Sequence, residues 1–332
     1  MAPKDIRDVA LCPGLIWGFD FAPGEASPVD ELDLLHPDAR PPGFRWLHFN
    51  LSDLRTERWL RAASLLPGDI VDMFLSVDQA QQCVYDQGVL GLVLHDLELE
   101  FHDSDPNVGS FRVALASSFI ITGRNHPVRS AETIKRRMEA GVSVPDADAA
   151  LDLIFTSMAD VFRRTNADLE AAVQVVEDEL LKDHPSTDAR TFLNMRSLMV
   201  RMHRLYSGTR AMLGLLEDET ALPTTFLKAA DRFAGRLSNL DAELLASQSQ
   251  LRLLRDELDL QATQQTNQNL YFLSVLTALL MPATLVTGIF GMNTGGLIWL
   301  SAKYGSLYAT GLAIASSLLV YLVLRLSGFI RR

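Results

Sequence analysis

Residues 271–290 read YFLSVLTALLMPATLVTGIF, and this run decides how the rest of the chain is interpreted. It contains no charged residue, and as an α-helix it is about 30 Å long, which matches the hydrocarbon core of a bilayer. A second uncharged run, 304–324, follows after a loop at 291–303 that is too short for a domain. The chain is therefore predicted to end in a transmembrane hairpin, with spans at about 271–290 and 304–324.

Charges beside the spans predict the orientation of this hairpin. Arg325, Arg331 and Arg332 follow the second span, whereas the loop between the spans carries only Lys303. Basic residues favour the cytosolic side of a membrane. The N-terminus has no basic segment followed by an apolar core, so no signal peptide is predicted. We therefore expect an inner-membrane protein with both termini in the cytosol.

Acidic charge is concentrated outside the hairpin. The whole chain carries a net charge of −11 and the residues after Asp259 carry +4, so the part up to Asp259 carries −15. This balance argues against nucleic acid as a partner, because phosphates need a basic surface. It suits attraction of cations, although acidic surfaces also serve solubility alone. Cys12 and Cys83 lack CxxC spacing, so neither a structural zinc site nor a disulfide framework is predicted.

Residue patterns divide the chain into three predicted domains: an α+β cytosolic domain at 1–145, a helical cytosolic stalk at 146–265 and the transmembrane hairpin at 266–332. In the first domain, alternating or β-rich sequence predicts strands at 44–51, 91–101, 111–115 and 118–122, the last ending at Gly123. Ser52 and Asp53 are expected to cap a helix that reaches Leu66 and is stopped by Pro67-Gly68. Ser130 is expected to cap a short helix that ends at Ala140.

Beyond Pro145, apolar residues recur at helical spacing. Helices are predicted at 149–181, 187–217 and 223–290. The last would be about 100 Å long if it is helical throughout, so it needs partners along its length. A row of leucines at three- and four-residue spacing predicts packing against helices of the same chain or of other subunits. These are Leu237, Leu240, Leu244, Leu251, Leu254 and Leu258.

One face of the long predicted helix carries a row of residues that we call the polar stripe. It consists of Asp256, Leu260, Thr263, Asn267, Leu270, Ser274, Thr277, Met281, Thr284 and Gly288. Hydroxyl and amide groups can hold a hydrated cation through its water shell without trapping it, which is what conduction needs. Small polar residues also let membrane helices pack closely, so both interpretations stay open. A pore would require an oligomer, since each chain supplies one such helix.

The triplet Gly291-Met292-Asn293 follows the polar stripe and is predicted to form the outer pore mouth. The Asn carbonyl oxygen is a good partner for a hard hydrated cation, and Gly permits tight backbone geometry. At the other end of the stripe, Asp256 is a candidate for an inner carboxylate ring. An ion pair of Asp256 with Arg252 or Arg255 is the alternative.

With these features the chain resembles the CorA superfamily of divalent-cation transporters. Members combine an α/β cytosolic domain, a long stalk helix, a Gly-Met-Asn signature and a second span with a basic tail. Here Thr294-Gly295-Gly296 follows the signature and no acid precedes the second span, which is similar to the ZntB branch associated with zinc transport. The segments WLHFNLSD at 46–53 and ITGRNHPVRS at 121–130 are also similar to that branch.

The resemblance implies a homopentamer around a central pore that carries zinc. Proton-coupled uptake is the favoured mechanism, and efflux is the alternative direction. The resemblance also implies that Asn293 forms the outer selectivity ring and that Thr284, Met281 and Asn267 are pore rungs. Neither span contains Asp, Glu or His, so proton coupling would need groups outside the spans. The alternatives are a magnesium or cobalt channel of the CorA type, and a cytosolic sensor or scaffold anchored by the hairpin.

Other candidate sites are few. His102, Asp103 and Asp105 form a candidate regulatory cation site, for which a solvated acidic turn is the alternative. No phosphate-binding loop, nucleophile elbow or paired carboxylates are recognisable in the sequence. The chain is therefore predicted not to be an enzyme and to need no cofactor; its predicted partners are copies of itself, the lipid bilayer and divalent cations.

Overall fold

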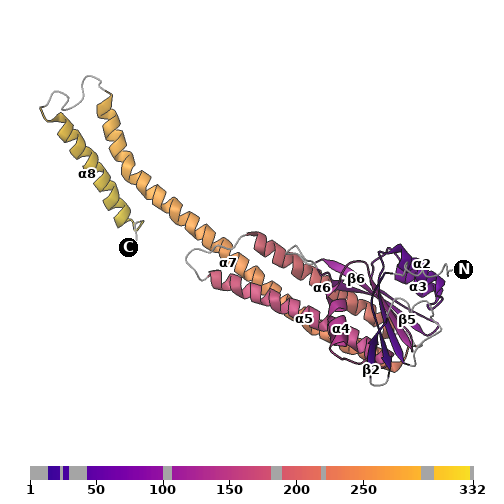
Figure 1. Cartoon of the computed structure of the whole chain (residues 1–332). Coiled ribbons are helices and arrows are strands. Elements are labelled where there is room, and N and C mark those ends of the chain that lie inside the picture. The colour runs from indigo at the N-terminus through magenta and orange to yellow at the C-terminus, as the bar shows by residue number, and fades with distance from the viewer. Residues whose placement is uncertain are drawn as a thin grey trace. The chain divides into compact units, whose positions relative to one another are not determined.

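The computed structural model describes residues 14–22, 25–29, 43–99, 107–180, 189–217, 222–292 and 303–329. The chain divides into two compact units, Met1–Leu254 and Arg255–Arg332. Helix α7 (Thr224–Gly291) begins in the first unit and ends in the second. Figure 1 labels the helices and strands β2, β5 and β6. The domain boundaries drawn from the sequence at 145 and 265 stay predictions.

The first unit is built on a 7-stranded sheet with the order β2-β1-β3-β7-β6-β5-β4. Its strands are β1 (Leu15–Ala22), β2 (Glu25–Pro28), β3 (Phe44–Asn50), β4 (Gln82–Asp86), β5 (Val89–Leu97), β6 (Val108–Leu115) and β7 (Phe119–Arg124). All neighbours pair antiparallel except β3 and β7, which run parallel. The unit is therefore an α+β domain in which β7 returns beside β3 after the β4–β6 meander.

The four predicted strands are confirmed, with changes at their ends. Strand β7 does not stop at Gly123 but continues to Arg124, because Gly123 pairs with Phe49 on one side and Arg112 on the other. The end of the strand expected up to residue 101 lies partly outside the described residues. Strands β1, β2 and β4 were not predicted. A signal for β4 was present at Gln87-Gly88, whose φ angles of 48° and 83° form the tight turn of a hairpin.

Helices α2 (Leu54–Ala62) and α3 (Gly68–Leu75) pack on one face of the sheet. Asp53 is the N-cap of α2, as expected, and its side chain accepts a hydrogen bond from the Arg55 N–H. The expectation that this helix reaches Leu66 is wrong: it ends at Ala62, and Pro67 instead precedes the new helix α3. Proline suits that place because its missing N–H has no partner at a helix start.

Helix α4 (Arg129–Glu139) is held to the sheet by a buried carboxylate rather than by the predicted cap. Ser130 lies inside the helix and Val128 occupies the cap position, so the predicted capping role of Ser130 is wrong. Its N–H and its hydroxyl donate to Asp96 of β5 at 2.8 and 2.9 Å, and the Leu97 N–H donates to the same side chain at 2.8 Å. Burial nevertheless raises the pKa of Asp96 to about 6.

Helices α5 (Ala147–Leu180), α6 (Ala189–Glu217) and the first part of α7 complete the first unit and lie side by side (Figure 1). These helices were predicted; residues 187 and 188 lie outside the described part. Phe155 of α5 stacks on Phe233 of α7 with ring centroids 4.6 Å apart. The leucines at 237, 240, 244 and 251 are buried, while Leu254 and Leu258 are half-buried. The buried leucines therefore pack within the chain.

A polar layer crosses this three-helix interface. The Asn166 side-chain amide donates to the backbone carbonyl of Leu240 at 2.8 Å and accepts from the Tyr206 hydroxyl at 2.9 Å. Next to it, His203 and Asp241 are 2.6 Å apart, and Arg210 lies 3.9 Å from the same carboxylate. Burial raises the pKa of Tyr206. These bonds fix the relative register of α5, α6 and α7.

Candidate functional site

The second unit consists of the last part of α7 and α8 (Gly305–Leu326). Both helices are long and apolar enough to cross a membrane, with mean hydropathy of 2.0 in the most apolar window of each. Few of their side chains are buried: the buried share of the most apolar window is 0% in the first helix and 6% in the second. The predicted helices at 271–290 and 304–324 are confirmed, and their exposed apolar surface suits a lipid environment.

One face of α7 is directed toward α8. Its half-buried residues recur every three or four positions: Val275, Ala278, Leu279, Pro282, Ala283 and Val286. A gap of about 420 Å³ remains between the helices, lined by Leu279, Ala283 and Thr287 of α7 and by residues such as Thr310 and Ser317 of α8. Beyond the gap, the Tyr271 hydroxyl donates to the Phe329 carbonyl at 2.6 Å. The half-buried residues therefore mark the side of α7 that faces α8.

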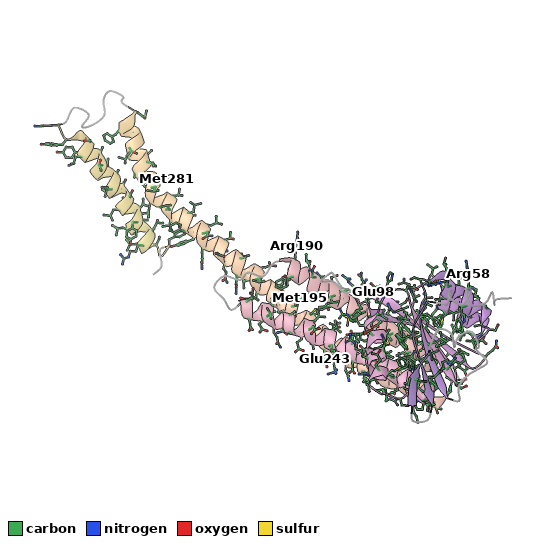
Figure 2. The ribbon with its side chains drawn as sticks, viewed as in Figure 1. Arg58, Glu98, Arg190, Met195, Glu243 and Met281 are labelled. Carbon is green, nitrogen blue, oxygen red and sulfur yellow. The ribbon has the colours of Figure 1, made fainter. Side chains whose placement is uncertain are left out.

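The polar stripe lies on the other side of α7. At about 100° per residue, its members from Asn267 to Gly288 point roughly 150° away from the half-buried residues. All ten stripe residues are exposed; Met281, marked in Figure 2, is 62% exposed. Within the described chain, therefore, α8 does not cover the stripe. Close packing against α8 therefore does not account for the small polar residues of the stripe, whereas close packing between membrane helices of different chains stays an alternative.

The threonine hydroxyls of the stripe are oriented by hydrogen bonds to their own helix. Thr277 donates to the Leu273 carbonyl at 2.8 Å, Thr284 to the Met281 carbonyl at 2.8 Å, and Thr263 to the Asp259 carbonyl at 2.8 Å. Back-bonding of this kind is usual for Thr in membrane helices. It satisfies the hydroxyl hydrogen inside the helix and leaves the oxygen lone pairs for other partners.

The ends of the stripe are only partly described. Asp256 is exposed, and among the described residues no ion pair joins it to Arg252 or Arg255. Helix α7 ends at Gly291, and Met292 is 66% exposed. Asn293 lies outside the described residues, as do His102, Asp103 and Asp105. In the part of the chain that the structure describes, no group of three or more His, Cys, Asp or Glu could hold a metal ion.

A cavity in the first unit was not predicted. It has a volume of about 1080 Å³ and lies between β5, β6 and α6, with His95, Glu98, His126, Arg201 and Arg204 among its lining residues. His95 is 2.7 Å from the Gln79 carbonyl. No spacing in the sequence could have revealed this cavity, because its residues come from separate elements that only the fold brings together.

Comparisons with known proteins agree with this architecture. A family model described as CorA-like Mg2+ transporter protein matches residues 42–326. The chain is 26% identical over 290 residues to "Zinc transport protein ZntB" of Pectobacterium carotovorum subsp. carotovorum (strain PC1), with 85% of each chain covered. It is 22% identical over 294 residues to the protein of the same name from Yersinia pestis, with 86% of each covered.

Solved structures show the same fold at low sequence identity. The structure of the full-length CmaX protein aligns with a TM-score of 0.76 at 21% identity, covering 94% of this chain and 97% of that one. The complete structure of the CorA magnesium transporter from Methanocaldococcus jannaschii aligns with a TM-score of 0.77 at 16% identity, covering 95% and 98%. The α+β domain, the long helix and the C-terminal helical pair are common to these structures.

Proposed function

The chain belongs to the family of CorA-like Mg2+ transporter proteins, and from that membership we propose that it carries divalent cations, zinc in particular, through the central pore of a homopentamer. Family membership supports the transport of a divalent cation. Zinc is favoured by the relatives called zinc transport protein and by Gly295-Gly296 after the signature triplet. A transporter of this kind needs no catalytic residues and no resident cofactor.

The observation that carries the proposal is the exposed polar stripe on α7. It lies on the side of the helix away from α8, and it leads directly to Gly291-Met292-Asn293. The hydroxyls of Ser274, Thr277 and Thr284 are poorly suited to face lipid, because hydrocarbon offers their lone pairs no hydrogen-bond donors. If the stripes of neighbouring chains face one another, their polar groups avoid contact with lipid and enclose a hydrated path. This is why we place copies of α7 around a common axis.

Each part of the stripe has a proposed role in that path. Asn293 forms the outer ring, with Gly291 and Met292 shaping the mouth. Polar rungs come from Asn267, Ser274, Thr277 and Thr284, and Leu270 and Met281 form apolar constrictions. Gly288 allows close approach of neighbouring helices, and Asp256 forms an inner carboxylate ring. Such weak, repeated contacts let a cation enter and leave.

The two candidate spans support insertion of the protein in a membrane. We place it in the inner membrane with both termini in the cytosol, because Arg325, Arg331 and Arg332 follow the second span. In this orientation the acidic first unit lies in the cytosol. The triplet 291–293 then lies at the outer mouth, where cations enter during uptake.

Zinc flux into proteoliposomes loaded with a zinc-sensitive dye tests the proposal. We expect a zinc signal from protein-containing liposomes that exceeds the signal from empty ones. Acceleration by an inward proton gradient would support coupled uptake, and indifference to the gradient would support a channel. Parallel flux measurements with magnesium and cobalt show which of the three ions the protein transports. Equal zinc signals with and without protein would contradict zinc transport, and the same result for all three ions would favour an anchored sensor or scaffold.

A further inference from the structure

We propose that the cavity between β5, β6 and α6 binds an organic phosphate of the nucleotide class, with its phosphate on the basic part of α6 and its apolar body further along the same helix. The cavity has a volume of about 1080 Å³, and its lining residues belong to the first unit. Small-molecule sites typically enclose roughly 300–1000 Å³, so a ligand of this size fits. The site is separate from the polar stripe, and the inference does not depend on ion transport.

The cavity is basic, although the chain around it is acidic. The residues up to Asp259 carry a net charge of −15. The described lining residues nevertheless include four basic side chains and one carboxylate: His95, His126, Arg201, Arg204 and Glu98. A basic recess in an acidic surface concentrates anions at one place. The ligand is therefore expected to carry negative charge.

Two arginines of α6 supply the phosphate-binding groups. Arg201 and Arg204 are three positions apart, so both side chains leave the same side of the helix. The Arg204 guanidinium is exposed and makes no ion pair or hydrogen bond with the described residues, so its N–H donors are available to a ligand. Guanidinium groups hold phosphate oxygens through parallel, charge-assisted N–H···O bonds. Arg204 is thus the residue that we expect to contribute most to binding.

The apolar body of the ligand lies on the continuation of the same helix face. Leu205, Gly208, Met212 and Leu215 recur every three or four positions and line the cavity. Leu205 and Met212 are buried, whereas Leu215 is 62% exposed, so a ligand that covers Leu215 buries apolar surface that solvent now contacts. Arg204 and Met212 are separated by about two helical turns. The ligand must therefore have a charged end and an apolar end.

One wall of the cavity, the segment 79–81, is held from two sides. His95 Nε2 donates to the Gln79 carbonyl at 2.7 Å, which joins the segment to β5. The Gln81 side-chain amide donates to the Thr209 hydroxyl at 2.8 Å, which joins it to α6. Gly208 permits this close approach, because a Cβ atom there would lie 2.6 Å from the Gln81 Oε1. The wall is fixed by these contacts, so little ordering is needed when a ligand enters.

Glu98 favours a nucleotide over a simpler phosphate ester. This side chain, labelled in Figure 2, is half-buried and forms no ion pair with the described bases of the cavity. A carboxylate accepts hydrogen bonds from hydroxyl and amino groups, and it repels phosphate. A nucleotide offers such donors on its sugar and base, phosphate oxygens for the arginines and a planar apolar face for the leucines. It is the class of organic phosphate that matches all three sets of lining groups.

Calorimetric titration of the detergent-purified full chain with ADP tests this site. EDTA in the buffer keeps divalent cations from linking ADP to other groups. We expect saturable binding, which Arg204→Ala weakens by about tenfold or more because charge-assisted hydrogen bonds are lost. Leu215→Ser should weaken it by about threefold or more, since less apolar surface is buried. Arg196→Ala is the matched control: this arginine is also exposed on α6 but does not line the cavity, so its variant should bind ADP as the wild type does.

Two further compounds separate the parts of the ligand. Adenosine lacks the phosphate and inorganic phosphate lacks the apolar body, so each should bind at least about tenfold more weakly than ADP. Size-exclusion profiles equal to that of the wild type show that each variant has assembled.

Absence of saturable ADP binding, or equal affinities of Arg204→Ala and Arg196→Ala, would overturn the inference. Adenosine or inorganic phosphate that binds as tightly as ADP would overturn it as well. Zinc flux in proteoliposomes tests the proposed function separately, and neither result decides the other.

Discussion

The pKa of the Asp96 carboxyl depends strongly on the surroundings of this buried side chain. Its carboxylate receives three hydrogen bonds at the junction of β5 and α4, yet it is completely buried. Burial disfavours the charged form, and here it outweighs the hydrogen bonds and raises the pKa to about 6. The pairing joins the sheet to α4, so the protonation of one side chain affects the stability of the first unit.

Asp96→Asn should change how stability depends on pH. Because the folded-state pKa of about 6 lies above the ordinary value of 3.8 for an Asp carboxyl, the folded chain holds the proton more tightly than the unfolded chain. The contribution of Asp96 is therefore full below the unfolded pKa and is lost as pH rises through the folded one. We expect the stability advantage of the wild type over the variant to shrink by on the order of 2–3 kcal/mol across that window.

Denaturation of both full-length proteins in detergent over a series of pH values measures this difference. Comparing the two chains at each pH cancels the contribution of the other titrating groups. A difference that is constant with pH, or that grows as pH rises, would show that the carboxylate is not destabilised by burial.

Asn293 is the residue whose replacement should affect ion choice most. Asn293→Ala removes the proposed ring of carbonyl oxygens at the outer mouth, so we expect loss of zinc flux or broadened selectivity among divalent cations. Assembly should be unaffected, since the change leaves the helices intact. Ion competition in proteoliposomes, with size-exclusion chromatography beside it, provides the measurement. A fully assembled variant with wild-type flux and ion preference would remove Asn293 from the proposed filter.

Among the elements, helix α7 belongs to both units. Its 68 residues begin among α5 and α6 and end in the second unit. Buried leucines hold its first part, whereas the residues of its last part are exposed on the stripe side. The polar layer at Asn166, Tyr206 and Leu240 fixes the first part against its neighbours. Changes at this layer should therefore appear as lost stability of the helix packing.

Asn166→Ala should destabilise the three-helix packing by about 2–4 kcal/mol, because it leaves the buried Tyr206 hydroxyl without its acceptor and removes the second hydrogen bond to the Leu240 carbonyl. Adding Tyr206→Phe removes the unpaired hydroxyl. The double variant should therefore lose less stability than the two single variants together. Chemical denaturation of the four proteins in detergent gives the coupling. Strictly additive losses would show that the Asn166–Tyr206 hydrogen bond contributes no coupling.

The long helices were predictable because their signals are local and repeated. The apolar periodicity of α5 to α8 and the uncharged runs of the hairpin are visible in the sequence alone, and so is the stripe from Asp256 to Gly288. The start of α3 at Gly68 was missed, because Pro67-Gly68 is equally typical of a stop. The capping of α4 was assigned to Ser130, although the capping group is Asp96, 34 positions away. Only the fold brings such partners together, and only coordinates give the direction of the Thr277 and Thr284 hydroxyls.

A pore lined by the polar stripe requires several copies of the chain. One chain supplies one polar stripe, and in the described residues α8 packs on a different side of α7. The exposed stripe therefore needs neighbours that are not part of the single chain. The closed ring of identical chains proposed above would supply those neighbours.

The mass of the detergent-purified protein should equal that of a homopentamer. Native mass spectrometry measures this directly, and release of single chains at high collision energy confirms the composition. A monomer or dimer as the stable species would leave the stripe without enough copies to enclose a path. It would favour the anchored sensor or scaffold.

The most direct test of the central claim is whether water and ions pass along the stripe. In a background with Cys12→Ser and Cys83→Ser, single cysteines replace Met281 on the stripe or Leu279 on the side facing α8. Zinc flux into proteoliposomes is then measured before and after treatment with a water-soluble, charged thiol reagent. If the stripe lines the path, the reagent blocks zinc flux in Met281→Cys and leaves flux in Leu279→Cys unaffected. Block at Leu279→Cys with no effect at Met281→Cys would contradict this placement of the stripe.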